Sequence, residues 1–286
     1  FYNSKDIIFM SLLSINIYFL IKILKKTNLK YLIIISFITA LSINLRVIGV
    51  LFYPLTLFVL IFANYCKIID RNKLYKITLI YLITSTFLTI IFFPYLWSNP
   101  IENFLEAINT MSNFPVQENS NTLYFGEWIS LGNLPWHYLP SWILITTPPF
   151  IIFLFFFGLI KTIKDLLNRP IKKYSPKEIF LITNFLIIIT PILAIIILNA
   201  KVYNGWRHIY FIYPSIIIIS TYGFKYFFEI LRNFNFGKFI CFASFFMFII
   251  YQSFWIFKTH PMQNVYFNSF VNKTWNTQFD LDYWGL

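Results

Sequence analysis

The sequence predicts an all-α polytopic membrane protein, and two observations carry this prediction. First, eight apolar runs approach or reach the length of a helix that crosses a hydrocarbon core. They lie at about residues 7–23, 31–45, 49–65, 77–96, 141–160, 179–199, 209–223 and 239–256. Second, apolar residues make up 58% of the chain, and Phe alone occurs 36 times. A soluble domain of this composition would expose large apolar patches and aggregate.

Basic residues divide unevenly between the two sides of such a membrane protein. If every run crosses once, 17 of the 23 Lys and Arg residues fall on one side. They are Lys22, Lys25, Lys26, Lys30, Lys67, Arg71, Lys73, Lys76, Lys161, Lys164, Arg169, Lys172, Lys173, Lys177, Lys225, Arg232 and Lys238. The positive-inside rule makes this side cytoplasmic. We therefore expect a multi-pass protein of the inner membrane with both ends of the chain extracytoplasmic.

The net charge of +12 does not predict a nucleic-acid partner. The cytoplasmic loops hold 17 basic and four acidic residues, whereas the outer segments hold six basic and seven acidic residues. The basic excess is therefore confined to the cytoplasmic side, where it also suits anionic lipid headgroups. The bilayer is the partner that this charge pattern indicates.

We expect the chain to be a fragment of one transmembrane domain that covers residues 1–286. It begins at Phe1 within a polar stretch and ends at Leu286 after an aromatic, acidic cluster. N-terminal helices with a first outer loop, and a C-terminal region, are expected to lie outside it. Two extracytoplasmic segments remain, a long loop at 94–140 and a C-terminal segment at 257–286.

The long outer loop is predicted to contain a short interfacial helix. Asn99-Pro100 is a helix start signal, and Ile101, Phe104, Leu105 and Ile108 follow at helical spacing. We expect an amphipathic helix at 100–112 that lies along the membrane surface. The remainder of the loop, rich in aromatic residues, is expected to be ordered and functional, with an interfacial aromatic belt as the alternative.

Four outer residues are candidates for chemistry. Arg46 lies between two short apolar runs, and either binds a phosphate or forms a structural ion pair with a part of the protein outside this sequence. Arg207 and His208 directly precede the run at 209–223, and an arginine at that depth needs an anion or water. Its planar fork suits a phosphate, with a snorkelling anchor as the alternative. Asp6 precedes the first run, where a carboxylate also suits a helix N-terminus.

The sequence carries no strong motif for a metal or a nucleotide. His137, His208 and His260 are all predicted to lie outside, but no pair has the spacing of a metal motif. A divalent metal is therefore left open, and no cofactor is assigned. A Gly-rich nucleotide loop, a Ser-His-Asp spacing and an HExxH motif are absent from the sequence. A group donor on the outer face would more naturally be linked to a lipid than to a nucleotide.

Six segments in order resemble a known enzyme family. They are FYNSKDIIF at 1–9, LRVIG at 45–49, PYLWSNP at 94–100, LPWHYLPSWILITTPP at 134–149, NGWRHIYFIYP at 204–214 and HPMQNVYFNSF at 260–270. Together they resemble bacterial family-39-like glycosyltransferases of the GT-C superfamily, which includes the protein O-mannosyltransferases and the aminoarabinose transferases of lipid A. The resemblance covers nearly the whole chain.

This resemblance implies a GT-C-type transmembrane helix bundle with an extracytoplasmic active site. Its members move a sugar from a polyprenyl-phosphate carrier to an acceptor protein, lipid or glycan, and we expect inversion. The main catalytic base of the family lies in a first outer loop, which would be upstream of Phe1. Asp6 matches a second acidic position, and Arg46 matches a position that contacts the donor phosphate. Arg207 and His208 are assigned to the same phosphate by our own inference.

The aromatic outer loop would then hold the sugar and the acceptor. The residues assigned to this role are Glu127, Trp128, Trp136, His137 and Tyr138. Two alternatives stay open, a transporter or ligase of polyprenyl-linked glycans and a non-enzymatic membrane protein. Transporters place charged groups near the bilayer midplane and contain repeated halves. The nearly uncharged runs of this chain, and the absence of a visible repeat, favour chemistry at the outer interface.

Overall fold

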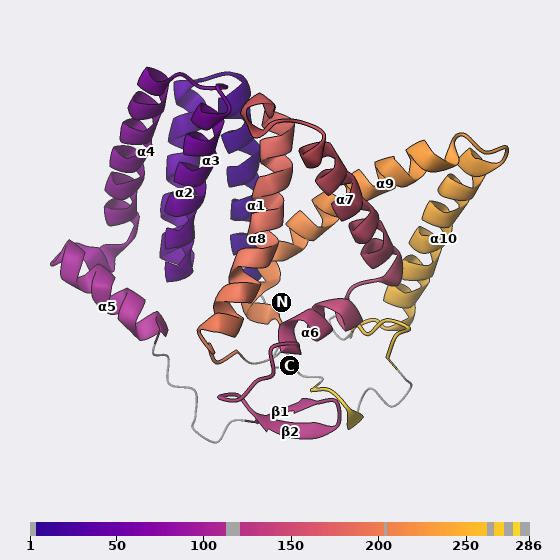
Figure 1. The fold of residues 1–286 in the computed structure, drawn as a ribbon. Coiled ribbons are helices and arrows are strands. Elements are labelled where there is room, and N and C mark those ends of the chain that lie inside the picture. Colours follow the sequence, from indigo (N-terminus) through magenta and orange to yellow (C-terminus); the bar gives the residue numbers. More distant parts are fainter. Residues whose placement is uncertain (1–3, 113–120, 203–204, 262–265, 272–276, 281–286) are drawn as a thin grey trace. The chain divides into compact units, whose positions relative to one another are not determined.

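The computed structural model describes residues 4–112, 121–202, 205–261, 266–271 and 277–280, and it is predominantly helical (Figure 1). The chain divides into two compact units. The first unit consists mainly of Asn3–Glu118 and Asp165–Leu186, and the second mainly of Asn119–Lys164 and Ile187–Leu286. Glu118, Lys273 and Asp282, which were counted in the charge balance of the outer segments, lie outside the described residues. The expectation of a single transmembrane domain stays a prediction.

Six helical segments of the described residues are long and apolar enough to cross a membrane. They are Lys5–Lys25, Val47–Tyr65, Arg71–Phe92, Pro176–Ile197, Arg207–Leu231 and Gly237–Lys258. A bent helix pair, Tyr138–Thr146 with Pro149–Leu167, adds a seventh span if the pair counts as one, and the apolar helix Leu29–Leu45 is shorter. The prediction of an all-α, multi-pass membrane protein is confirmed in this coarse form. The count of eight crossings stays a prediction.

The first unit is built from α1 (Ser4–Lys25), α2 (Leu29–Leu45), α3 (Phe52–Tyr65), α4 (Arg71–Phe92), α5 (Pro100–Ser112) and the first part of α8 (Pro176–Ile197). Short 3₁₀ segments connect them: η1 (Val47–Leu51), η2 (Pro94–Leu96) and η3 (Ile171–Lys173). α2 packs against both α1 and α4, and α5 packs against η1 and η2. The predicted helix at 100–112 is confirmed as α5.

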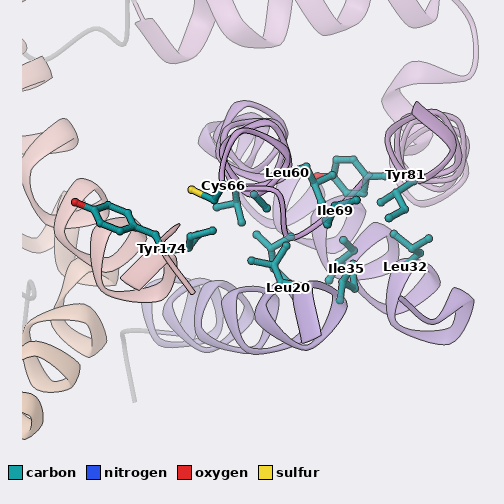
Figure 2. Close-up of a cluster of buried hydrophobic side chains, with 14 residues drawn as sticks. Leu20, Leu32, Ile35, Leu60, Cys66, Ile69, Tyr81 and Tyr174 are labelled. Carbon is teal, nitrogen blue, oxygen red and sulfur yellow. The ribbon is translucent and has the colours of Figure 1, made fainter. Parts of the chain in front are cut away.

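The core of the first unit is apolar and includes two buried tyrosines, Tyr81 and Tyr174 (Figure 2). Leu20 of α1, Ile35 of α2 and Leu60 of α3 lie in this core with Tyr81 of α4. The Tyr81 hydroxyl is 3.0 Å from Thr39 Oγ1 and donates to the Phe52 carbonyl at 3.3 Å. Hydrogen bonds of this kind join helices in a membrane, where water offers no competing partner. One tyrosine therefore links α4 to α2 and to the start of α3.

The basic connections of the first unit gather at one end of its helices. Lys25 precedes the α1–α2 turn, and Lys67 follows α3. The third connection joins this end because the Cys66 thiol donates to the Ile171 carbonyl at 3.2 Å, and Lys172 lies 6.0 Å from the centre of the Tyr65 ring. The predicted grouping of basic residues is therefore present in space within this unit.

The second unit contains β1 (Asn121–Tyr124), β2 (Glu127–Ser130), α6 (Tyr138–Thr146), most of α7 (Pro149–Leu167), the end of α8, η4 (Arg207–Ile212), α9 (Tyr213–Leu231) and α10 (Gly237–Lys258). α9 packs against α10 and η4. Lys161 and Lys164 of α7 lie over the Tyr226 ring near the end of α9. The start of α9 lies at the end of this helix opposite to Tyr226, and α6 contacts the segment that precedes it.

A β-hairpin departs from the all-α prediction. β1 and β2 pair antiparallel, with Asn121 opposite Ser130 and Tyr124 opposite Glu127. The two turn residues, Phe125 and Gly126, both have positive φ angles of 51° and 86°, as a type I′ turn requires. Phe279 forms a further bridge to Tyr124. Residues 121–140 of the loop are thus ordered as predicted, but through strands that the prediction omitted, and residues 113–120 lie outside the described residues.

The predicted helix at 141–160 is also different, because it consists of two helices. α6 ends at Thr146, α7 begins at Pro149, and the two axes are bent by 118°. Pro148 disfavours helical geometry in the preceding residue, and Thr147 is accordingly extended, with φ −101° and ψ 135°. The Pro148-Pro149 pair therefore breaks the run that hydropathy alone reads as continuous.

Candidate functional site

Asp6 and Arg46 form an ion pair at the end of the first unit opposite its basic connections. Arg46 Nη1 donates to Asp6 Oδ1. The Asp6 side chain is 7% exposed, and the Arg46 side chain is 25% exposed. Asp6 lies in the first turn of α1, and Arg46 caps the C-terminus of α2. The pair therefore joins the ends of two neighbouring helices, whereas an acid that only caps its own helix would not need a partner on another helix.

Arg207 and His208 open η4 in the second unit, and both are half-buried. The two residues before them are buried and held in place by hydrogen bonds. The Gly205 N–H donates to the Tyr138 hydroxyl at 3.2 Å, and Trp206 Nε1 donates to Thr146 Oγ1 at 2.8 Å. α6 therefore holds the two residues that directly precede Arg207, and so determines the position of the Arg207 backbone.

A pocket lies beside this connection, within the second unit. Its volume is about 470 Å³, inside the range of roughly 300–1,000 Å³ that small-molecule sites occupy. The segment from Leu131 to Leu139 forms one wall, and the end of α8 with the following residues forms the other. Trp136 and Tyr138 are the predicted sugar-site residues that line it.

The other predicted sugar-site residues do not line this pocket. His137 Nδ1 is hydrogen-bonded to the Tyr124 hydroxyl at 2.7 Å, so it fastens β1 to the start of α6. Burial raises the pKa of the Tyr124 hydroxyl, which keeps the phenol protonated for this contact. Glu127 and Trp128 are exposed on β2. Their assigned role in sugar or acceptor binding stays a prediction.

An aromatic cluster packs between the hairpin and α6, with Phe279 in contact with both Tyr124 and Trp142. Trp142 is fully buried, with ring centroids 5.5 Å from Phe279 and 5.8 Å from Phe267. Backbone bonds hold the same C-terminal segment on β1: the Gly126 N–H donates to the Gln278 carbonyl at 3.0 Å, and the Asp280 N–H donates to the Leu123 carbonyl at 3.1 Å. The C-terminal segment is therefore part of this site's framework.

Asn268 stabilises the bend between α6 and α7. Its Nδ2 donates to the Leu144 carbonyl at 2.6 Å and to the Thr147 carbonyl at 2.7 Å. Its backbone N–H donates to the Ile145 carbonyl at 2.8 Å. Pro148 and Pro149 have no N–H, so they leave the Leu144 and Ile145 carbonyls without the donors that a continuous helix would supply. One buried amide therefore satisfies the acceptors that the bend leaves open.

Replacing Asn268 by Ala is expected to destabilise the second unit by about 2 kcal/mol, because two carbonyl oxygens lose their buried donor. The measurement is unfolding of the full-length protein in mixed micelles with a denaturing detergent. Ser269→Ala is the control, since Ser269 is exposed in the same turn. Equal midpoints for the two variants would contradict this role of Asn268.

No group of three or more His, Cys, Asp or Glu side chains suited to a metal ion occurs among the residues that the structure describes. Comparisons with family models, characterised protein sequences and solved structures gave no match. The similarity to family-39-like glycosyltransferases therefore stays an expectation. It rests on the six sequence segments alone.

The structure brings the predicted residues together in two groups, one in each unit. Asp6 meets Arg46 in the first unit, while Trp136 and Tyr138 meet at the pocket of the second unit near the segment that leads to Arg207. A joint phosphate site of Arg46 and Arg207 stays a prediction. Sequence reasoning missed the other contributors to the second group, among them Asn133, Ile195, Asn199, Asn268 and Phe279. In the sequence, only Gly132 and Asn133 indicated a turn in the segment that forms one wall of the pocket.

Proposed function

We propose that this chain is part of a GT-C-type, mannosyltransferase-like glycosyltransferase of the inner membrane. It would transfer a sugar from a polyprenyl-phosphate donor to an acceptor on the extracytoplasmic face. One observation carries the proposal most directly: the half-buried Arg207 lies two residues after Gly205, whose N–H donates to Tyr138 in the wall of a sugar-sized pocket. Within the second unit, Lys161 and Lys164 lie over the Tyr226 ring near the end of α9, whereas Arg207 opens η4, directly before this helix. By the positive-inside rule this supports an extracytoplasmic position for Arg207.

In the proposed reaction, charged groups stabilise the departing phosphate and aromatic groups bind the sugar. The acceptor oxygen forms a bond to the anomeric carbon while the bond from that carbon to the phosphate oxygen breaks. A carboxylate takes the acceptor proton. Negative charge develops on the departing polyprenyl phosphate, which the Arg207 guanidinium is suited to stabilise with His208 beside it. Trp136 and Tyr138 provide aromatic surface for a sugar.

The decisive experiment follows consumption of labelled polyprenyl-phosphate sugars by the full-length protein in membranes. Arg207→Ala is expected to lower the rate of transfer by about 100-fold. Enzymes lose about this much when one hydrogen-bond donor to a developing negative charge is removed. Lys201→Ala is the matched control, because Lys201 is an exposed cation in the same connection. Equal amounts of inserted protein would show that the loss is not one of folding.

Two outcomes would contradict the proposal. Wild-type rates in Arg207→Ala would remove the arginine from phosphate stabilisation. Donor binding without consumption across the whole panel of sugars would favour a carrier or transporter of lipid-linked glycans. Arg207→Lys provides a finer test, since lysine keeps the charge but loses the planar pair of donors.

A further inference from the structure

The pocket of the second unit has a lining that restricts its ligand. Thirteen residues of the described chain form it: Leu131, Gly132, Asn133, Leu134, Pro135, Trp136, Tyr138, Leu139, Ile195, Ile196, Asn199, Ala200 and Val202. None of these lining residues is Asp, Glu, Lys, Arg or His. A charged ligand would leave water for this pocket without an opposite charge to receive it, which is costly. The lining therefore suits an uncharged ligand.

The polar groups of the pocket suit a ligand with hydroxyl groups. Asn133 and Asn199 are exposed, and each side-chain amide can donate and accept hydrogen bonds. The Tyr138 side chain is buried, and its hydroxyl accepts the Gly205 N–H at 3.2 Å, so Tyr138 holds the wall in place while the two amides supply the polar groups. Such groups pair with the hydroxyls of a sugar ring, which also donate and accept.

The apolar groups suit the other face of a sugar ring. Trp136 is 69% exposed and is one of the residues that line the pocket. Its ring is perpendicular to that of His137, at 89° and with centroids 5.6 Å apart. An indole face that is held in position and open to solvent can stack on the C–H face of a sugar. Ile195 and Ile196 provide an aliphatic surface opposite.

We propose that this pocket binds an uncharged saccharide, and that this saccharide is the acceptor of the transfer. The second half of this inference rests on the proposed function. The sugar of the donor is bonded directly to a phosphate, so its site requires cations close by. The lining itself holds no cation, and Arg207 follows in the sequence beyond the lining residues. We therefore assign the donor phosphate to Arg207 and the acceptor to the pocket. The saccharide is either free or the headgroup of a glycolipid, because both present the same ring.

The test measures binding of uncharged methyl hexosides to the full-length protein in lipid nanodiscs. Glycoside detergents are avoided because their headgroups would compete for the site. Trp136→Ala is expected to weaken binding by about tenfold, as for an aromatic group at the centre of a contact. Phe270→Ala is the matched control, since Phe270 is a 65% exposed aromatic residue in the same unit but does not line the pocket. Asn133→Ala is a second variant, and it is also expected to weaken binding.

Two further arms define the ligand. A methyl hexuronide, which carries a carboxylate, is expected to bind more weakly than the matching hexoside. The same sugar on a long alkyl chain separates the two sources: tighter binding indicates a glycolipid headgroup, and equal binding indicates a free saccharide. Binding that is unchanged in Trp136→Ala and Asn133→Ala would overturn the pocket assignment.

Failure of this inference can be told apart from failure of the proposed function. If uncharged hexosides bind but the wild-type protein consumes no donor, the saccharide pocket stands and the transferase proposal falls. If donor is consumed but no uncharged hexoside binds, the transferase proposal stands and the acceptor assignment falls. In an active enzyme, Trp136→Ala should raise the KM for the acceptor and leave the KM for the donor unchanged.

Discussion

Replacing Arg46 by Ala is expected to destabilise the first unit by about 3 kcal/mol. The reason is the carboxylate of Asp6, which is 7% exposed and accepts from Arg46 Nη1. Removing one partner of a buried ion pair leaves the other charge in a poorly solvated place, and the measured cost of such changes is about 3–5 kcal/mol. Because the Arg46 side chain is 25% exposed, we expect a cost at the lower end of this range.

The measurement is a double-mutant cycle on unfolding in mixed micelles. Asp6→Asn with Arg46→Ala should be more stable than Arg46→Ala alone, because the double variant carries no buried, uncompensated carboxylate. Lys5→Ala is the control, since Lys5 is an exposed cation next to Asp6, and its effect should stay within about 0.5 kcal/mol. Strictly additive effects of the two substitutions would show that the pair contributes nothing.

The same variants separate the two roles that the sequence leaves open for Arg46. If the double variant recovers both stability and transfer, the pair is structural. If it recovers stability while transfer stays low, Asp6 or Arg46 also takes part in the reaction. Arg46→Lys then indicates which feature matters, because it keeps a cation near Asp6 but removes the planar fork.

Local patterns predicted most of the helices and little of the site. Residues 100–112 were predicted correctly as α5 because a start signal and helical spacing lie within a few residues of each other. The Asp6–Arg46 pair joins residues 40 positions apart, and only the packing of α1 against α2 determines that they meet. The sequence therefore indicated that each residue was unusual but not that they were partners.

The second unit shows the same division between local and distant information. The prolines that break 141–160 are visible in the sequence, but the mean hydropathy of the run outweighed them. The pocket joins residues 131–139 to 195–202, so neither stretch predicts it alone. The four-residue strands β1 and β2 are stabilised by Phe279 from the C-terminal segment, a contact that no window of the sequence contains.

Gly158→Ala is expected to separate α7 from α9 and to destabilise the second unit by about 2 kcal/mol or more. A Cβ atom at Gly158 would overlap the carbonyl oxygen of Ile219, and one at Gly223 would overlap that of Leu154. These neighbours are backbone atoms, which cannot rotate away as a side chain can. Extra atoms in a packed interface cost about 1–3 kcal/mol. Small residues let helix backbones approach closely in membranes.

The matched control is Gly132→Ala, because the nearest atom to a Cβ there is Ser130 Oγ at 3.9 Å. Gly223→Ala should resemble Gly158→Ala, and the double variant should cost less than the sum of the two, since the first substitution already parts the helices. Unfolding midpoints of Gly158→Ala and Gly132→Ala that coincide would contradict the close crossing.

The crossing also has a consequence for the proposed chemistry. η4 leads directly into α9, and the Ser220 hydroxyl of α9 donates to the Ile151 carbonyl of α7 at 3.1 Å. α9 therefore carries Arg207, while α7 follows the bend that Trp206 contacts through Thr146. Parting the helices would move Arg207 away from the wall formed by Tyr138. We expect Gly158→Ala to lower the Arg207-dependent transfer as well as stability, whereas Gly132→Ala should preserve the stability.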